Sequence, residues 1–130
     1  VKPGHHLNIL TYGMTVQKSL LASTFLEQSP PGKSIEVIDL RSLAPYDWEA
    51  ISHSVQKTSR VLIVHEDTLS FGYGAEIAAR ISGELFDYLD APIGRVAALD
   101  TWVGYHPDLE DEILPQTEDI QREAERLLAY

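Results

Sequence analysis

The chain has 130 residues, of which 44% are hydrophobic and 23% are charged, and this composition is typical of one folded domain with a single core. The absence of cysteine excludes disulfide scaffolds, thiolate metal sites and cysteine nucleophiles. The formal net charge of −10 disfavours binding to nucleic acid and suits a basic protein partner, although it also fits a simple solubilising surface.

The first quarter of the chain predicts one strand and one helix. Residues 1–6 fit no element, so we expect a disordered or engineered start and a domain that spans residues 7–130. Residues 7–12 (LNILTY) predict a strand, and residues 14–28 predict a helix that ends before the breaker run SPPG. The predicted apolar stripe of this helix comprises Leu20, Leu21, Thr24 and Phe25.

The middle of the chain repeats this alternation. Residues 35–40 predict a second strand, and Asp47 is a candidate N-cap because its carboxylate can accept from the free amides of a first helical turn. The capped helix should bury Trp48, Ile51 and Val55. Residues 60–64 predict a third, almost wholly apolar strand, and residues 65–67 (HED) should begin a polar loop.

Three further elements are predicted after this loop. Gly72 and Gly74 open a helix, residues 93–99 predict a fourth strand, and Thr117 is a candidate cap of a last helix. The inner positions of the two helices are Ile77, Ile81 and Leu85, and Ile120, Ala124, Leu127 and Leu128. Residues 100–116 have no period and predict a long irregular connection, a kind of loop that is often functional.

Strands and helices thus alternate along the whole chain, without a linker or an internal repeat. This order predicts one α/β domain with a mostly parallel sheet and helices on both faces. In such sheets, the loops that leave the carboxyl ends of the strands usually carry the ligand and partner sites. The loop at residues 65–74 is therefore the first place to look for a site.

Two familiar motifs fail in this loop on residue spacing. The HE pair would need a second histidine at position 69 to form a zinc-protease site, but that residue is Leu69. The GYG run would need a third glycine at position 77 for dinucleotide binding, but that residue is Ile77. We therefore expect Gly72 and Gly74 to form a helix-entry turn that needs positive φ.

Acidic and aromatic residues supply the remaining candidates. Glu66 and Asp67 could act as general acid and base, but neighbouring acids in a loop are more often solvated or paired with arginine. The acidic cluster at residues 108–112 indicates either the start of a helix or a surface for a basic partner. Aromatic residues of the kind that anchor interfaces are Trp102, Tyr105 and Tyr130.

Four segments, taken in order, resemble one known family. They are residues 35–51 (IEVIDLRSLAPYDWEAI), 61–81 (VLIVHEDTLSFGYGAEIAARI), 89–101 (LDAPIGRVAALDT) and the LE…LP pattern of residues 109–115. Together they resemble the C-terminal domain of the E1 β subunit of thiamine-diphosphate-dependent 2-oxo acid dehydrogenases, a member of the transketolase C-terminal domain family. The resemblance runs in unbroken order from about Leu7 to Tyr130.

This resemblance implies a three-layer α/β/α fold with a mostly parallel, five-stranded sheet. It implies a parent enzyme that uses thiamine diphosphate and Mg²⁺ to decarboxylate a branched-chain 2-oxo acid or pyruvate and to pass the acyl group to lipoyl-E2. The family holds this cofactor on its other domains, and the chain has no GDG…N diphosphate signature. We therefore expect no catalytic, cofactor or metal site here, and an inactive domain when it is isolated.

The family uses this domain for assembly, so the implied partners are an E1 α subunit or domain, a second β subunit and the basic peripheral subunit-binding domain of E2. Residues His65, Glu66, Gly72 and Gly74 match a family segment that is expected to shape a loop or a subunit contact. Asp90 and Tyr130 match positions that dock E2 in some members, where acidic side chains and the C-terminal carboxylate are used. The implied compartment is the bacterial cytoplasm or, in a eukaryote, the mitochondrial matrix.

The sequence departs from the family after Asp100, where Trp102 and Gly104 replace the prolines of a D-x-P-x-P run. This loop should therefore follow its own path and use Trp102 as a contact residue. Two alternatives also remain open. One is the C-terminal domain of a transketolase or deoxyxylulose phosphate synthase, and the other is a free-standing, non-catalytic dimeric binding module.

Overall fold

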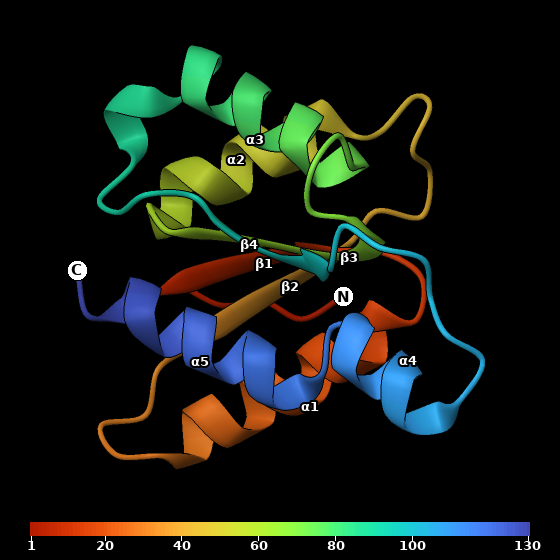
Figure 1. Cartoon of the computed structure of the whole chain (residues 1–130). Coiled ribbons are helices and arrows are strands. Elements are labelled where there is room, and N and C mark those ends of the chain that lie inside the picture. Colours follow the sequence, from red (N-terminus) through yellow and green to blue (C-terminus); the bar gives the residue numbers. More distant parts are fainter.

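Four parallel strands form the central sheet in the order β2-β1-β3-β4 (Figure 1). The structure is a computed structural model that describes residues 1–130. Its strands are β1 (Leu7–Thr11), β2 (Ile35–Asp39), β3 (Val61–Thr68) and β4 (Gly94–Ala98). The expected α/β class is confirmed, with four strands in the sheet where five were expected.

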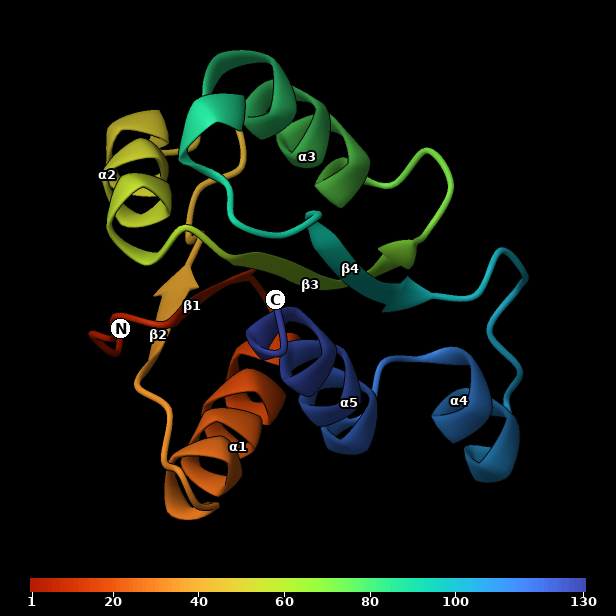
Figure 2. The same ribbon diagram turned by 90° about the vertical axis from the view of Figure 1, so that its left-hand side faces the viewer.

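Helices cover both faces of this sheet (Figure 2). Helices α1 (Thr15–Gln28) and α5 (Thr117–Leu128) lie on one face, and α2 (Trp48–Thr58) and α3 (Tyr73–Glu84) lie on the other. Across the sheet, the chain steps from β1 to β2 in one direction. It then passes from β2 back over β1 to β3 and on to β4 in the opposite direction. Right-handed crossovers require this change of face when the direction reverses.

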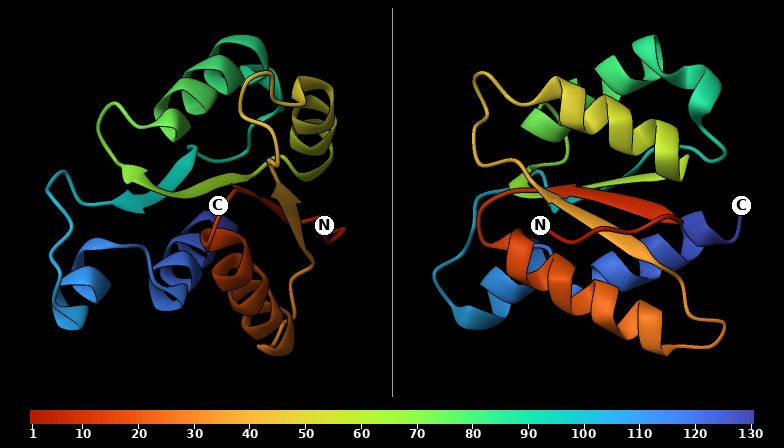
Figure 3. Two further views of the ribbon diagram at one scale, coloured as in Figure 1. Left: turned by 90° about the vertical axis from the view of Figure 1, so that its right-hand side faces the viewer. Right: turned by 180° about the vertical axis from the view of Figure 1, so that it is seen from behind.

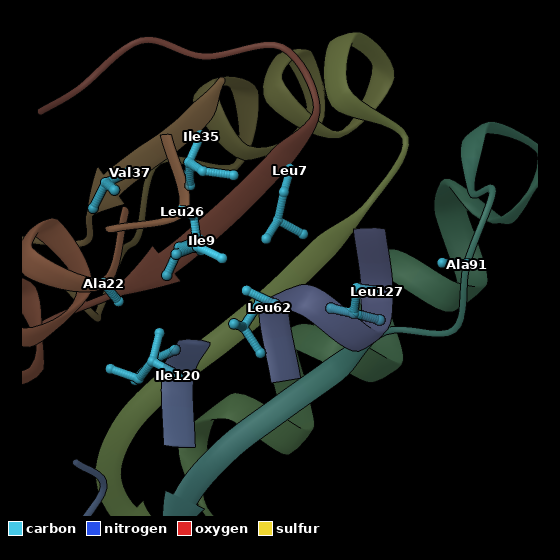
Figure 4. Packing of buried hydrophobic residues seen from close by; sticks show 12 residues of the cluster. Leu7, Ile9, Ala22, Leu26, Ile35, Val37, Leu62, Ala91, Ile120 and Leu127 are labelled. Atoms are coloured by element: carbon cyan, nitrogen blue, oxygen red, sulfur yellow. The ribbon is translucent and has the colours of Figure 1, made fainter. Parts of the chain in front are cut away.

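Each face of the sheet has its own apolar core. Alternate strand residues point to opposite faces, so Leu62 packs with α1 and α5 while Ile63 packs with α2 and α3. Figure 4 shows the first core, in which side chains of the strands meet Ala22 and Leu26 of α1 and Ile120 and Leu127 of α5. Because both faces are covered, β3 needs the continuous apolar run that its sequence shows.

Helix α1 buries a different face from the one that its largest apolar residues predict. Leu21 and Phe25 are exposed, and the buried face consists of Thr15, Val16, Ser19, Ala22, Ser23 and Leu26. The predicted stripe was therefore wrong for Leu21, Thr24 and Phe25, whereas Leu20 packs against the core as expected. Small residues on the inner face let α1 lie close to the sheet and to α5, a requirement that hydrophobicity alone does not reveal.

Two segments expected to be irregular are regular in part. Strand β3 continues through His65, Glu66 and Asp67 to Thr68, with an irregular register to β4 between Val64 and Thr68. Residues 107–113 form a short helix, α4 (Pro107–Ile113), with proline in its first turn and Asp108 and Glu110 near its amino end. Both features suit a helix start, because proline lacks the N–H that would be unpaired there and acids favour the positive end of the dipole.

The amino-terminal segment lies along the outer edge of β2 (Figure 3). Lys2 forms an isolated antiparallel bridge with Val37, and the amides of His5 and His6 donate to the carbonyl of Ser34. Residues 1–6 are thus held by backbone hydrogen bonds, in contrast to the disordered start that we expected. None of the helices has the length and apolar character needed to cross a membrane.

Candidate functional site

His65 lies in β3, three residues before the strand ends, and its ring packs against the start of α3. Its side chain is only 1% exposed, and its Nε2 accepts a hydrogen bond of 3.0 Å from the amide of Gly74. A neutral ring that accepts at Nε2 carries its proton on Nδ1. Burial lowers the pKa of His65 below its usual value, and the nearby Asp67 carboxylate opposes this effect in part. His65 therefore connects the end of the strand to the start of the helix.

Gly72 and Gly74 are required by the closeness of this ring rather than by their own backbone angles. A Cβ atom on Gly74 would lie 2.1 Å from His65 Nε2, and one on Gly72 would lie 2.0 Å from the carbonyl oxygen of Thr68. Gly72 has a φ of −67°, and the residue with positive φ in this loop is Phe71, at 60°. The expected glycine turn with positive φ was therefore wrong.

Aromatic rings fill the space beside His65. The Tyr12 ring stacks on it with centroids 5.7 Å apart, and Tyr73 meets the edge of Tyr12 at 6.3 Å. These rings lie at the carboxyl ends of β1 and β3, where the chain reverses direction across the sheet and where open α/β folds usually bind ligands. In this molecule, Tyr12 and His65 pack into that position.

The two carboxylates after His65 have different surroundings. Asp67 accepts hydrogen bonds from the amides of Thr68, at 2.8 Å, and Tyr73, at 3.2 Å, so it fixes the loop and the first turn of α3. Glu66 is half-buried. A carboxylate that satisfies amides at a helix start is a structural cap, and this role suits Asp67 better than proton transfer does.

Trp102 belongs to the connection between β4 and α4, and its side chain is 94% exposed. This connection is tied to the β3–α3 loop, because the Asp100 carboxylate accepts from both the amide and the hydroxyl of Ser70, at 2.8 and 2.5 Å. These hydrogen bonds hold the pKa of Asp100 below its usual value. The fully exposed Phe71 thus lies in a loop that is tied to the loop carrying Trp102, a pairing that the sequence analysis missed.

Asp90 and Tyr130 meet in one groove although they are 40 positions apart in the sequence. The groove has a volume of about 660 Å³ and lies beside α3 and the segment that leads into β4. Small and apolar side chains, among them Ala75, Ala79, Leu89 and Ile93, line it. The Asp90 carboxylate lies 3.7 Å from the Arg60 guanidinium and remains open to solvent. An acid on an apolar floor is suited to a partner with basic and apolar side chains.

The groove that contains Asp90 and the loops that carry Phe71 and Trp102 lie at opposite ends of the strands. Asp90 precedes β4, whereas Phe71 and Trp102 follow the carboxyl ends of β3 and β4. Figure 1 shows the same separation, with the C-terminus and α4 on opposite sides of the molecule. No group of three or more His, Asp or Glu side chains is placed to hold a metal ion.

Comparisons with known proteins agree on one family. The family model described as "Transketolase, C-terminal domain" matches residues 1–120. The mitochondrial pyruvate dehydrogenase E1 component subunit beta of Saccharomyces cerevisiae is 43% identical over 129 residues, which are 98% of this chain and 35% of the relative. The corresponding subunit of Staphylococcus aureus (strain Mu50) is 41% identical over 129 residues, which are 99% of this chain and 39% of the relative.

A second kind of E1 subunit and one solved structure extend this comparison. The 3-methyl-2-oxobutanoate dehydrogenase subunit beta of Mycobacterium tuberculosis is 44% identical over 100 residues, covering 77% of this chain and 28% of the relative. A solved chain described as "Split gene transketolase, inactive beta4 tetramer" superposes with a TM-score of 0.84 at 26% identity, covering 98% of this chain and 41% of that one. The chain thus spans between 28% and 39% of the length of these curated relatives.

Proposed function

The chain belongs to the transketolase C-terminal domain family, and from this membership we propose that it is the assembly domain of the β-type subunit of a 2-oxo acid dehydrogenase E1 component. The observation that carries the proposal is 41–43% identity to E1 β subunits over 129 residues, almost the whole chain. The 26% identity to the split-gene transketolase is much lower, so the E1 assignment is favoured over the transketolase alternative. The substrate is pyruvate or a branched-chain 2-oxo acid, because relatives of both kinds match.

The cofactor of such an enzyme is thiamine diphosphate with Mg²⁺, which would supply the chemistry of decarboxylation. The residues of this chain do not fit that group. Mg²⁺ beside a diphosphate is usually held by one or two carboxylates together with the phosphates, and this chain lacks the GDG…N signature that would supply such a site. His65 is buried, and its ring accepts a hydrogen bond from the amide of Gly74, so it is a packed side chain. We therefore derive no catalytic step from this chain.

The proposed role of the domain is to join subunits. The β3–α3 loop exposes Leu69 and Phe71, and we propose that it lies in a contact between two β-type subunits, with His65, Gly72 and Gly74 fixing its shape. Glu66 and Trp102 are the further candidates for this contact. Sedimentation equilibrium tests this role, because a monomer at high micromolar concentration would contradict it.

The groove that contains Asp90 and Tyr130 is the proposed docking site for E2. The acidic Asp90 on an apolar floor and the net charge of −10 suit the basic peripheral subunit-binding domain. Titration calorimetry with that purified domain should show that Asp90→Asn weakens binding about tenfold, as expected when one partner of a charge pair is lost at an interface.

The matched control is Asp87→Asn, an exposed acid on the neighbouring 3₁₀ turn, η1 (Phe86–Tyr88), outside the groove lining. This variant should bind as the wild type does. Equal binding by the wild type and Asp90→Asn would show that E2 does not dock in this groove.

A further inference from the structure

Arg60 is a largely buried cation whose hydrogen-bonding capacity is hardly used. Its side chain is 22% exposed, and its Nε is buried without a hydrogen-bond partner. A guanidinium carries five N–H donors, and a buried donor that is left unpaired costs free energy. Such an exception needs an explanation, and the one salt-bridge partner of Arg60 is the carboxylate of Asp90.

The contact between Arg60 and Asp90 is a loose ion pair. Its N–O distance of 3.7 Å is longer than the 2.8 Å between Arg80 and Glu84. The Asp90 side chain is 62% exposed, so the cation lies deeper in the molecule than the acid does. Asp90 is therefore paired on its inner side, while its outer side is free to accept hydrogen bonds from a partner.

The main chain of Asp90 is fixed independently of this ion pair. Its amide donates to the carbonyl of Ser59 at 2.8 Å. Leu89 packs against the core on the α2 and α3 face of the sheet, and Ala91 is buried in the core on the α1 and α5 face. Only the side chain of Asp90 is left to be ordered, and Arg60 is the charged group placed to order it.

Arg60 is itself held at the amino end of β3. Its carbonyl accepts from the amide of Asn8 at 2.9 Å and from the hydroxyl of Thr58 at 3.3 Å. A cation on this rigid base restricts the neighbouring carboxylate, and a binding side chain that is restricted in advance loses less entropy when a partner docks. The same cation repels a basic partner, but repulsion at long range is screened by salt.

We propose that Arg60 is a positioning residue of the docking groove, which holds the Asp90 carboxylate in the orientation that receives a basic side chain of the partner. This inference rests on the proposed function, which makes the groove a docking site for E2. In the complex, Asp90 lies between two cations, with Arg60 on its inner side and the basic group of the partner on its outer side.

The test measures the Kd between the assembled E1 component and the peripheral subunit-binding domain of E2 by titration calorimetry at 50 and 200 mM salt. Arg60→Gln should raise the Kd about three- to fivefold at 200 mM salt, and less at 50 mM, where the lost repulsion compensates in part. Arg60→Lys should bind within about twofold of the wild type, because a contact of 3.7 Å requires a cation rather than a bidentate fork.

Three further variants separate positioning from other effects. Arg60→Met keeps the apolar stem and should weaken binding as Arg60→Gln does. Arg41→Gln removes the cation of another loose pair, 3.5 Å from Asp39, so it matches the change in net charge and should leave the Kd unchanged. In the Asp90→Asn background, Arg60→Gln should raise the Kd no further, because the charge that Arg60 orients is already gone.

Each other outcome contradicts a defined statement. If Arg60→Gln and Arg60→Met bind as tightly as the wild type or more tightly, while Asp90→Asn binds weakly, the docking role stands and the inference is wrong. An equal rise in Kd with and without the Asp90 charge would show that Arg60 acts through the fold, which also refutes the inference. No binding by the wild type would refute the proposed docking, and the inference with it.

Discussion

His65 joins β3 to α3 through a single accepted hydrogen bond and through the two glycines that leave room for its ring. The ring is also stacked on Tyr12, so the residue that directly follows β1 contributes to the same contact. A histidine at the end of a strand in a glycine-containing loop suggests catalysis, yet the surroundings make this one a packed side chain. Two measurements of stability test that role.

Replacement of Gly74 by alanine should lower the free energy of unfolding by about 1–3 kcal/mol, because the new methyl group would force the His65 ring out of its place. Urea denaturation of the chain measures this change. Gly83→Ala is the matched control in the same helix, since a Cβ there has nothing within 4 Å. That variant should gain up to about 1 kcal/mol, as expected for glycine replaced by alanine in a helix. Equal effects of the two variants would contradict the close contact.

The stability of the chain should decrease as the pH falls below about 6.5, the usual pKa of histidine. Burial lowers the pKa of His65 in the folded state, so below that pH the unfolded state binds more protons than the folded state does. Protonation also removes the Nε2 lone pair that accepts from Gly74. Urea denaturation between pH 7.5 and 5.5 should show a shallower pH dependence in His65→Gln, whereas the exposed control His53→Gln should follow the wild type.

At the scale of elements, helix α1 shows why a hydrophobic pattern can select the wrong face. The helix has two apolar faces, and the sheet takes the one with smaller residues because α5 must also fit beside it. The prediction is that Leu26→Ala costs about 2–5 kcal/mol, as core truncations do, whereas Phe25→Ala costs less than about 1 kcal/mol. Urea denaturation measures both costs. If Phe25→Ala lost more stability than Leu26→Ala, the face that hydrophobicity predicts would be the buried one.

At the scale of the molecule, the sheet separates two surfaces of different character. The groove beside α3 combines Asp90 with an apolar floor, whereas the loops that follow β3 and β4 carry the exposed Phe71 and Trp102 near the exposed acids of α4. Both are suited to basic partners, and neither overlaps the packed ring cluster around His65. This arrangement is consistent with a domain that works by contact.

Addition of thiamine diphosphate with Mg²⁺ should therefore leave the Tm of this chain unchanged. A ligand that binds only the folded state raises the Tm, and this chain lacks the GDG…N diphosphate signature. The full-length subunits assembled together are the positive control and should show a clear rise in differential scanning calorimetry. A rise in the isolated chain would place a cofactor site on this domain.

The sequence by itself determined the order of the four strands and the four long helices, the α/β class and several local features, but not the short helix α4. The Asp47 cap was correctly predicted, with a hydrogen bond of 3.0 Å from the amide of Ala50, as were the buried positions Ile77 and Ile81. These features depend on neighbours within one turn or one strand, and residue spacing is enough to predict such local preferences. The family could also be recognised, because its segments occur in order along the chain.

Only the tertiary structure decided which residues meet. It brought Asp90 to Tyr130, tied the loop of Phe71 to that of Trp102 through Ser70 and Asp100, and placed His65 against Gly74. It also decided which face of α1 is buried, and that the strain in the β3–α3 loop falls on Phe71 rather than on a glycine. Each of these outcomes depends on the packing of elements distant in the sequence, where volume and close approach, rather than local preference, select the arrangement.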